Sequence, residues 1–448
     1  MKRRDFGKLT GGLLLSAAIP PGLVRAAGSS FDATSGETVY FRGWQFATDI
    51  VQANVARYNE QHNGKVDYGT ITGDYPALME QSLMANLPVD IIYAQPPDAV
   101  RWFEAGWLKS ADELENIDEI KADFYPNVLD AWSYKGHLLG LSYFVTFKGA
   151  VFVNLDAYEG AGLGDADMPK SWDELYEQVH QMGEAGVQTP FLPHWHSEWY
   201  GISYAFVWEM LNRGNQIADV DTHRSLLDTD ADGPAYKTLA AWKRLWNSKL
   251  VPEEVLTYNE ATYIAAFASG RYAMSPQTGY DVATFNDPAK SQIAGRCTFV
   301  PANGQSWGLV ESGMYMMTAR ERTPEQQKDV DRFLTWYGYK DDSGSAAIAE
   351  RWIKENLLFS AYRSVMESEE TAELIRQSLA RPEDYQTMLD LYSSAPFPGG
   401  VWKVVWSAEF NAYLKEMLPN FLVQDADIVE TITAMSDKIE ELNAKYGV

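Results

Sequence analysis

The stretch VDIIYAQPPDAVRWFEAGWL, residues 89–108, carries the signals that decide the fold. Residues 89–93 form a short apolar segment typical of a buried strand, and residues 97–105 follow with a helical pattern that ends at Gly106. The same order occurs upstream, with strands predicted over 38–42 and 65–68 and helices over 48–62 and 75–85. Downstream, we predict separate strands over 137–144 and 149–154, a helix with Ser171 as its N-cap, and a helix over 364–379. Strands and helices that alternate at this spacing predict an α/β fold with a parallel sheet.

Polar and aromatic side chains follow the ends of these three strands. Trp44 and Gln45 follow the first strand, Asp74 and Tyr75 the second, and Gln95 the third. In open parallel sheets, ligands bind beyond the carboxyl ends of the strands. We therefore expect these five side chains to line one rim of a binding site.

The N-terminus has the pattern of an export signal. Arg3 and Arg4 precede Phe6 and Lys8, an apolar run over 9–19 is too short to span a bilayer, and small residues near 24–27 suit signal peptidase. The paired arginines, with Phe6 and Lys8, favour a twin-arginine signal over an ordinary secretory signal. We predict that residues 1–27 are cleaved and that the mature protein is periplasmic.

A strong negative charge limits the partners. The whole chain carries −25; removal of residues 1–26 takes five basic side chains and one acidic one, which leaves 32 basic against 61 acidic and a net charge of −29. Such a surface repels phosphate backbones and anionic lipid, so we expect no nucleic-acid partner, no membrane insertion and a monomer. Cys297 is the single cysteine, which excludes an internal disulfide.

Aromatic residues are abundant, with 15 Trp, 25 Tyr and 19 Phe. Many of them belong to the core, because aromatic side chains bury large apolar areas. Trp and Tyr also offer flat faces to the C–H surfaces of sugar rings. The composition is therefore compatible with a carbohydrate ligand.

Several segments, in chain order, resemble one protein family. They are IIY (91–93) with AGWL (105–108), GLSY (140–143) with VNLD (153–156), Leu163 with MPKSWDEL (168–175), FASGRYAM (267–274), and GMYMM (313–317) before a helix over 329–337. Their order and spacing are similar to the extracellular solute-binding proteins of family 1, relatives of the maltodextrin-binding protein that deliver sugars to bacterial ABC importers. Val153 departs from the family pattern, which usually has tyrosine there.

The resemblance implies a two-lobed periplasmic-binding-protein fold of type II-like architecture, in which discontinuous α/β lobes close like a hinge over the ligand. It places lobe I at 37–144 plus 308–340 and lobe II at 148–303 plus 343–448, with crossings near 143–148, 301–307 and 339–345. It implies a carrier, not an enzyme, that captures a mono- or oligosaccharide or a sugar derivative for an ABC permease without a cofactor.

The resemblance also implies further ligand-binding residues, because the matching segments reach the cleft in relatives. These residues are Tyr143, His194, Trp195, Trp199, Gln277, Tyr280, Trp307, Glu311, Ser312, Tyr362, Arg363 and Trp402.

The segment HWHSEWY, residues 194–200, allows a second interpretation. His194, His196 and Glu198 stand at alternate positions and could hold zinc or iron on an extended chain. Flanking prolines at 190 and 193 indicate an irregular loop, so we favour stacking by its tryptophans and keep the metal site as the alternative. Asp228, Asp230 and Asp232 imitate a calcium loop, but position twelve is Leu239, so we expect them to cap a following helix.

A secreted glycoside-active enzyme is the rival class of function. Such an enzyme needs two carboxylates that flank the scissile bond. Asp and Glu are too numerous here to single out a pair, and the sequence has no nucleophile elbow, P-loop, dinucleotide fingerprint or zincin motif.

Overall fold

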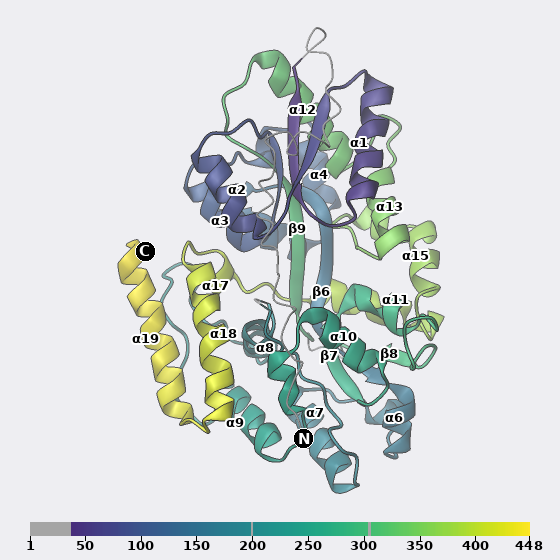
Figure 1. The fold of residues 1–448 in the computed structure, drawn as a ribbon, viewed down its shortest axis with the longest axis vertical. Coiled ribbons are helices and arrows are strands. Elements are labelled where there is room, and N and C mark those ends of the chain that lie inside the picture. Colours follow the sequence, from purple (N-terminus) through teal and green to yellow (C-terminus); the bar gives the residue numbers. More distant parts are fainter. Residues whose placement is uncertain (1–36, 199, 303–305) are drawn as a thin grey trace, which may run out of the picture.

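The computed structural model describes residues 37–198, 200–302 and 306–448, so the predicted signal peptide, Trp199 and part of the predicted second crossing lie outside the described residues. The molecule is elongated, and two α/β halves lie one above the other in Figure 1. Strands β6 and β9 run between the two halves. The α/β class predicted from the sequence is confirmed.

One sheet of seven strands, counted over the described residues, extends through both halves. Its order is β2-β1-β3-β9-β6-β7, with β8 also paired to β6. The first three strands are parallel, as predicted, and the other pairs are antiparallel. The strands are β1 (Val39–Trp44), β2 (Val66–Ile71), β3 (Ile91–Ala94), β6 (Leu141–Asn154), β7 (Met274–Thr278), β8 (Cys297–Phe299) and β9 (Leu309–Met317), with a separate hairpin of β4 (Ser133–Tyr134) and β5 (His137–Leu138).

Strand β6 connects the halves. The sequence predicted separate strands over 137–144 and 149–154, but residues 141–154 form one strand in which every residue is buried. Its first half pairs with β9 and its second half with β7 and β8, across a bulge near Gly149. Gly149 has φ +93, and a Cβ atom there would lie 2.6 Å from the Trp208 ring. Glycine is needed because it tolerates this backbone conformation and this close approach.

Helices cover the upper half in Figure 1 on both sides of the sheet. Helix α1 coincides with the predicted helix over 48–62, α2 ends one residue before the prediction, and α3 begins and ends one residue before it. The helices of chain segments 48–132 and 324–356 are α1 (Thr48–His62), α2 (Tyr75–Met84), α3 (Pro96–Glu104), α4 (Ile117–Asp123), α5 (Pro126–Trp132), α12 (Pro324–Gly338) and α13 (Ala347–Asn356).

The remaining helices come from two other chain segments. They are α6 (Leu155–Gly160), α7 (Trp172–Glu184), α8 (Ile202–Asn212), α9 (Pro234–Asn247), α10 (Glu260–Ala268), α11 (Val282–Phe285), α14 (Arg363–Met366), α15 (Glu369–Arg376), α16 (Tyr385–Ser394), α17 (Gly399–Trp402), α18 (Ser407–Val423) and α19 (Ile428–Tyr446). The single helix predicted over 364–379 is wrong: Ser368 caps a new helix, and α14 and α15 are separate.

Two predicted helix starts have different outcomes. Ser171 caps α7 as predicted, since its hydroxyl accepts a hydrogen bond from Glu174 N at 3.2 Å. The carboxylates before α9 do not cap it: Gly233 occupies the N-cap position. Asp228 and Asp230 instead accept hydrogen bonds from the backbone two residues on, as in Asx turns.

Candidate functional site

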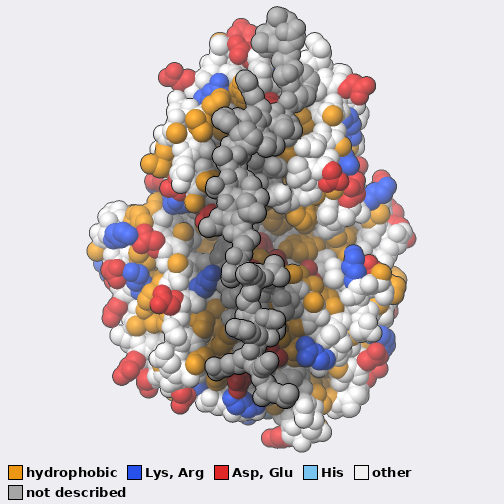
Figure 2. Space-filling model, in the orientation of Figure 1, with side chains coloured by type: hydrophobic (Ala, Val, Ile, Leu, Met, Phe, Trp, Pro, Cys, Tyr) orange, Lys and Arg blue, Asp and Glu red, His pale blue; other side chains and the backbone are white. Residues whose placement is uncertain are grey.

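A cleft of about 1580 Å³ lies between the two halves and is lined by residues from both. The five predicted rim residues, Trp44, Gln45, Asp74, Tyr75 and Gln95, all line it. The parallel strands β1, β2 and β3 end side by side, which is why residues from three separate segments meet at one edge. Figure 2 shows hydrophobic side chains around the middle of one face and charged side chains mostly farther out.

Aromatic rings form the wall on the β1–β3 side. The Trp44 ring lies 5.4 Å from that of Tyr75 and 5.6 Å from that of Tyr143, and it is partly exposed to the cleft. Tyr143 stacks on Tyr93, with ring centroids 4.7 Å apart and planes 3° apart. The Tyr75 hydroxyl donates to Tyr93 O at 2.9 Å, so only its ring is available to the cleft. This packing holds the Trp44 indole in place.

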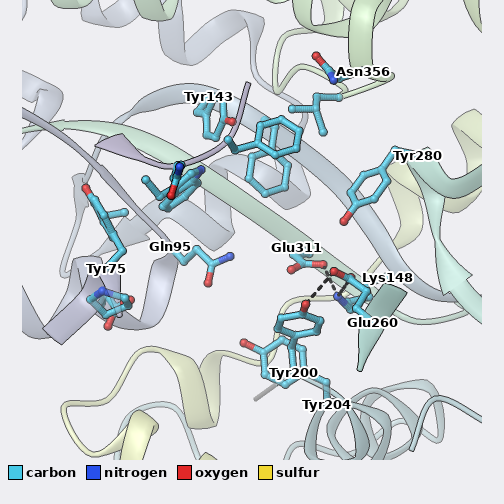
Figure 3. Close-up of a pocket in the computed structure, with 18 of the residues that line it drawn as sticks. Tyr75, Gln95, Tyr143, Lys148, Tyr200, Tyr204, Glu260, Tyr280, Glu311 and Asn356 are labelled. Carbon is cyan, nitrogen blue, oxygen red and sulfur yellow. Dashed lines mark hydrogen bonds and ion pairs between the residues drawn. The ribbon is translucent and has the colours of Figure 1, made fainter. Parts of the chain in front are cut away.

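A second group of rings faces it from the other half. Tyr204 on α8 packs against Trp402 on α17, with ring centroids 4.8 Å apart. Tyr200 and Tyr280 are partly exposed and also line the cleft, and Figure 3 shows the Tyr280 hydroxyl directed toward the centre of the cleft. The opposing rings therefore come from segments separated by up to about 350 residues of chain, from Trp44 to Trp402.

Charged side chains occupy the centre of the cleft. Lys148 on β6 is only 1% exposed, and its Nζ atom lies 3.2 Å from Glu311 Oε2 and 3.7 Å from Glu260 Oε1. Nζ also lies 3.9 Å from the centroid of the Tyr200 ring, whose hydroxyl donates to Glu260 Oε2 at 2.7 Å. Figure 3 shows these four side chains in contact. We call Lys148, Glu260, Asp281 and Glu311 the Lys148 cluster.

Two carboxyl groups of this cluster, those of Asp281 and Glu311, have raised pKa values. Burial, with repulsion from Glu260, raises the pKa of Asp281 to about 8. Burial also raises the pKa of Glu311, although Lys148 opposes the shift. Desolvation disfavours the charged form of each carboxyl, and one nearby lysine does not compensate three carboxylates.

The polar residues at the outer edge serve partly structural roles. Asp74 is exposed and caps α2, accepting a hydrogen bond from Ala77 N at 3.3 Å. Arg101 forms ion pairs with Glu80 and Asp98 on the same wall. The Gln95 side chain forms no hydrogen bond with another described residue, and Figure 3 shows its amide directed into the cleft.

Two of the predicted tryptophan contacts, Trp195 and Trp307, are buried in the core. Trp195 is 1% exposed and packs on Trp242 at 5.0 Å, so its ring belongs to the core. Trp307 is also 1% exposed; its indole donates to Pro301 O at 3.0 Å and packs on Trp172. Trp199 lies outside the described residues. The expectation that Trp195 and Trp307 face the ligand is corrected, because burial of the whole ring leaves no free face.

Four polar residues predicted at the cleft do not line it. Ser312 accepts a hydrogen bond from the Trp132 indole, and buried Gln277 donates to Ser275 Oγ. The Tyr362 hydroxyl donates to Gly338 O at 2.6 Å, and Arg363 is exposed and donates to Ala122 O. Each of these side chains forms a hydrogen bond within the protein, although the buried Gln277 Oε1 atom has no partner among the described residues. Of the predicted set, nine residues line the cleft: Trp44, Gln45, Asp74, Tyr75, Gln95, Tyr143, Tyr280, Glu311 and Trp402.

The two histidines of HWHSEWY form a buried pair. His194 and His196 are 2% and 0% exposed, and their Nε2 atoms lie 3.0 Å apart. Burial lowers the pKa of His196 to about 3 and that of His194 well below its usual value, so both rings are neutral. Glu198 does not join them: across the described residues, no three His, Cys, Asp or Glu side chains are grouped to hold a metal ion. Neither His194 nor its neighbour lines the cleft.

Sequence reasoning missed Lys148, Tyr200, Tyr204 and Glu260, which all line the cleft. Lys148 had a visible signal, since it is the single charge in an apolar run of 14 residues that forms β6. A buried lysine needs a carboxylate partner, which predicts a functional or structural ion pair. Tyr200, Tyr204 and Glu260 had no comparable signal, because their positions depend on how loops and helix ends meet.

An α/β molecule with discontinuous halves and a deep cleft between them has the architecture of two-lobed periplasmic binding proteins. Solved structures of similar fold include the sugar-binding protein MalE from Xanthomonas citri (TM-score 0.72, 16% identity, 92% of this chain and 98% of that chain). Two others are T. maritima MalE3 with maltose (0.71, 15%, 90% and 99%) and an ABC transporter solute-binding protein from Agrobacterium vitis S4 with D-mannitol (0.69, 15%, 92% and 99%).

The family model for bacterial extracellular solute-binding proteins matches residues 47–337, and the chain belongs to this family. The resemblance inferred from the sequence is thus confirmed. A search of curated proteins found no match. In the part of the chain that the structure describes, no helix is long and apolar enough to cross a membrane.

Proposed function

We propose that this protein captures a carbohydrate or polyol in the cleft and delivers it to the permease of an ABC importer. The observation that carries the proposal is the pair of opposed aromatic walls, Trp44 and Tyr143 on one side and Tyr204, Tyr280 and Trp402 on the other, with polar groups between them. T. maritima MalE3 and the A. vitis protein, which have a similar fold, were solved with bound maltose and bound D-mannitol, respectively. This supports the proposed ligand class.

The chemistry of the cleft suits a polyhydroxylated ligand. Aromatic faces cover the C–H patches of a sugar ring, while carboxylates and amides form directional hydrogen bonds with hydroxyls. A hydroxyl left without a partner in a closed site costs about 1 to 3 kcal/mol, so a wrong epimer is rejected. Gln95, Glu311 and Tyr280 provide such groups at the centre.

Lobe closure completes the proposed cycle. Lobe I would comprise 37–144 plus 308–340 and lobe II 148–303 plus 343–448, with β6 and β9 bending between them. The ligand would shift an existing open–closed equilibrium, and the permease would engage the closed form. The same proposal includes export into the periplasm by the twin-arginine route, with cleavage of residues 1–27. It also includes action as a monomer.

A ligand screen tests the proposal. Purified mature protein is mixed with a panel of monosaccharides, oligosaccharides and polyols, and its thermal unfolding is measured with each compound. Compounds that stabilise the protein are then titrated calorimetrically. A ligand at 100 times its Kd raises the free energy of unfolding by about 2.7 kcal/mol. Product analysis after long incubation separates the classes: stoichiometric binding without product supports a carrier, whereas turnover of a glycoside rejects it in favour of an enzyme. A panel without any hit contradicts carbohydrate capture.

A further inference from the structure

The Lys148 cluster contains more acidic than basic side chains. Lys148 supplies one ammonium, and Glu260, Asp281 and Glu311 supply three carboxyl groups on α10, on the turn before α11 and on β9. Glu311 and Glu260 lie 3.2 Å and 3.7 Å from Nζ, and Asp281 accepts one backbone hydrogen bond, from Thr278 N at 3.2 Å. The lysine therefore cannot neutralise the cluster.

Two of the three carboxyl groups are also largely shielded from solvent water. Asp281 is 5% exposed and Glu311 is 8% exposed. The Glu311 Oε2 atom is buried; among the described residues it has the ion-pair contact with Lys148 Nζ at 3.2 Å but no hydrogen bond. The raised pKa values of both carboxyls are the expected response to burial and mutual repulsion. An added positive charge would relieve both effects.

This inference rests on the proposed function and specifies its ligand: we propose that the cleft selects a carbohydrate or polyol that carries a protonated amine, with the ammonium held by Glu311 and Asp281. An ammonium donates three hydrogen bonds and accepts none, which matches a group of carboxylates. The Tyr280 ring, which also lines the cleft, adds a surface that attracts a cation.

Neutral and anionic ligands fit the same position less well. A neutral hydroxyl group does not offset the excess of acidic side chains, and a uronate or phosphate adds further negative charge. Lys148 is not free to bind an acid, because it is 1% exposed and already engages two carboxylates and the Tyr200 ring. A metal ion is also disfavoured, since the described residues contain no group of three metal-binding side chains at ligating spacing.

Matched ligand series test the proposal. The mature protein is titrated calorimetrically with four forms of each sugar: the 2-amino-2-deoxy sugar, its N-acetylated form, the parent sugar and the uronic acid. The series is measured in the gluco, galacto and manno configurations, together with the β1,4-linked disaccharides. In each configuration that binds, we expect the amine to bind at least about tenfold more tightly than the parent, as for a charge-assisted hydrogen bond. We expect the N-acetylated form to lose this advantage and the uronic acid to bind weakest.

Two substitutions locate the effect. Glu311→Gln and Asp281→Asn keep the shape and a hydrogen-bonding oxygen but remove one charge each, and each should lower the affinity for the amine about tenfold more than the affinity for the parent sugar. Glu113→Gln is the matched control, because Glu113 is an exposed carboxylate outside the cleft that pairs with Lys109. Circular dichroism confirms folding of each variant.

The outcomes separate this inference from the proposed function. A parent sugar that binds as tightly as its amine, or variants that weaken both ligands equally, would overturn the amine preference and leave carbohydrate capture standing. Failure of every compound to bind would contradict both.

Discussion

The carboxylate of Glu209 accepts a 2.6 Å hydrogen bond from the indole of Trp242 in the core between α8 and α9. Tyr176 donates a second hydrogen bond to the same oxygen. Glu209 is 2% exposed, and burial raises its pKa to about 7. A folded-state pKa above the unfolded value means that the folded protein binds this proton more tightly than the unfolded chain.

The first prediction concerns pH and stability. Between pH 4.5 and 7 the unfolded chain releases the Glu209 proton before the folded protein does, so this group makes the free energy of unfolding fall as pH rises. Glu209→Gln should remove that contribution. Denaturant unfolding from pH 4.5 to 8 should show a variant whose stability, relative to wild type, increases with pH; a constant difference would contradict the assignment. Asp281 and the His194–His196 pair titrate in both proteins, so they cancel in this comparison.

The second prediction concerns the Trp44 ring. Trp44→Ala removes a partly exposed face of the cleft, so affinity for the sugar found in the screen should fall about tenfold or more, as is usual for loss of an aromatic contact. Calorimetric titration measures the change. Trp246→Ala is the control, since Trp246 is also partly buried but lies outside the cleft on α9. Equal losses in both variants would show that Trp44 acts through stability.

The third prediction concerns Trp307, which the sequence suggested as a ligand contact. Trp307→Phe loses the indole hydrogen bond to Pro301 O and some packing on Trp172. We expect destabilisation by about 1 to 3 kcal/mol and a Kd within about twofold of wild type. Chemical denaturation and titration measure the two quantities. A large loss of affinity at unchanged stability would show that Trp307 contacts the ligand.

The fourth prediction concerns the bend of β6. Gly149→Ala meets both a positive φ and the Trp208 ring, and we expect a loss of more than about 2 kcal/mol. Gly162→Ala is the matched control: its φ is +82, but a Cβ atom there has no neighbour within 4 Å. The difference between the variants in thermal or chemical unfolding isolates the steric contact. Equal effects would mean that backbone conformation alone decides the cost.

Local sequence signals predicted those helices and strands well whose formation depends on residues close together in the sequence. The helix over 48–62 and the capped start of α7 follow from periodicity and a side-chain cap. The prediction of two strands separated by a break at residues 145–148 was wrong, because Thr146, Lys148 and Gly149 interrupt the apolar pattern of β6. Their partners, Glu311 and the Trp208 ring, lie far away in the sequence.

The sequence by itself determined the α/β class, the family and the rim of the cleft, since residues after parallel strands share one edge whatever the rest of the chain does. Only the tertiary structure decided which aromatic and charged side chains remain available to a ligand. Trp195 and Trp402 look alike in sequence, yet one packs inside the core and the other lines the cleft. Burial and ion pairing depend on groups that the fold brings together from distant segments, and no local pattern records those groups.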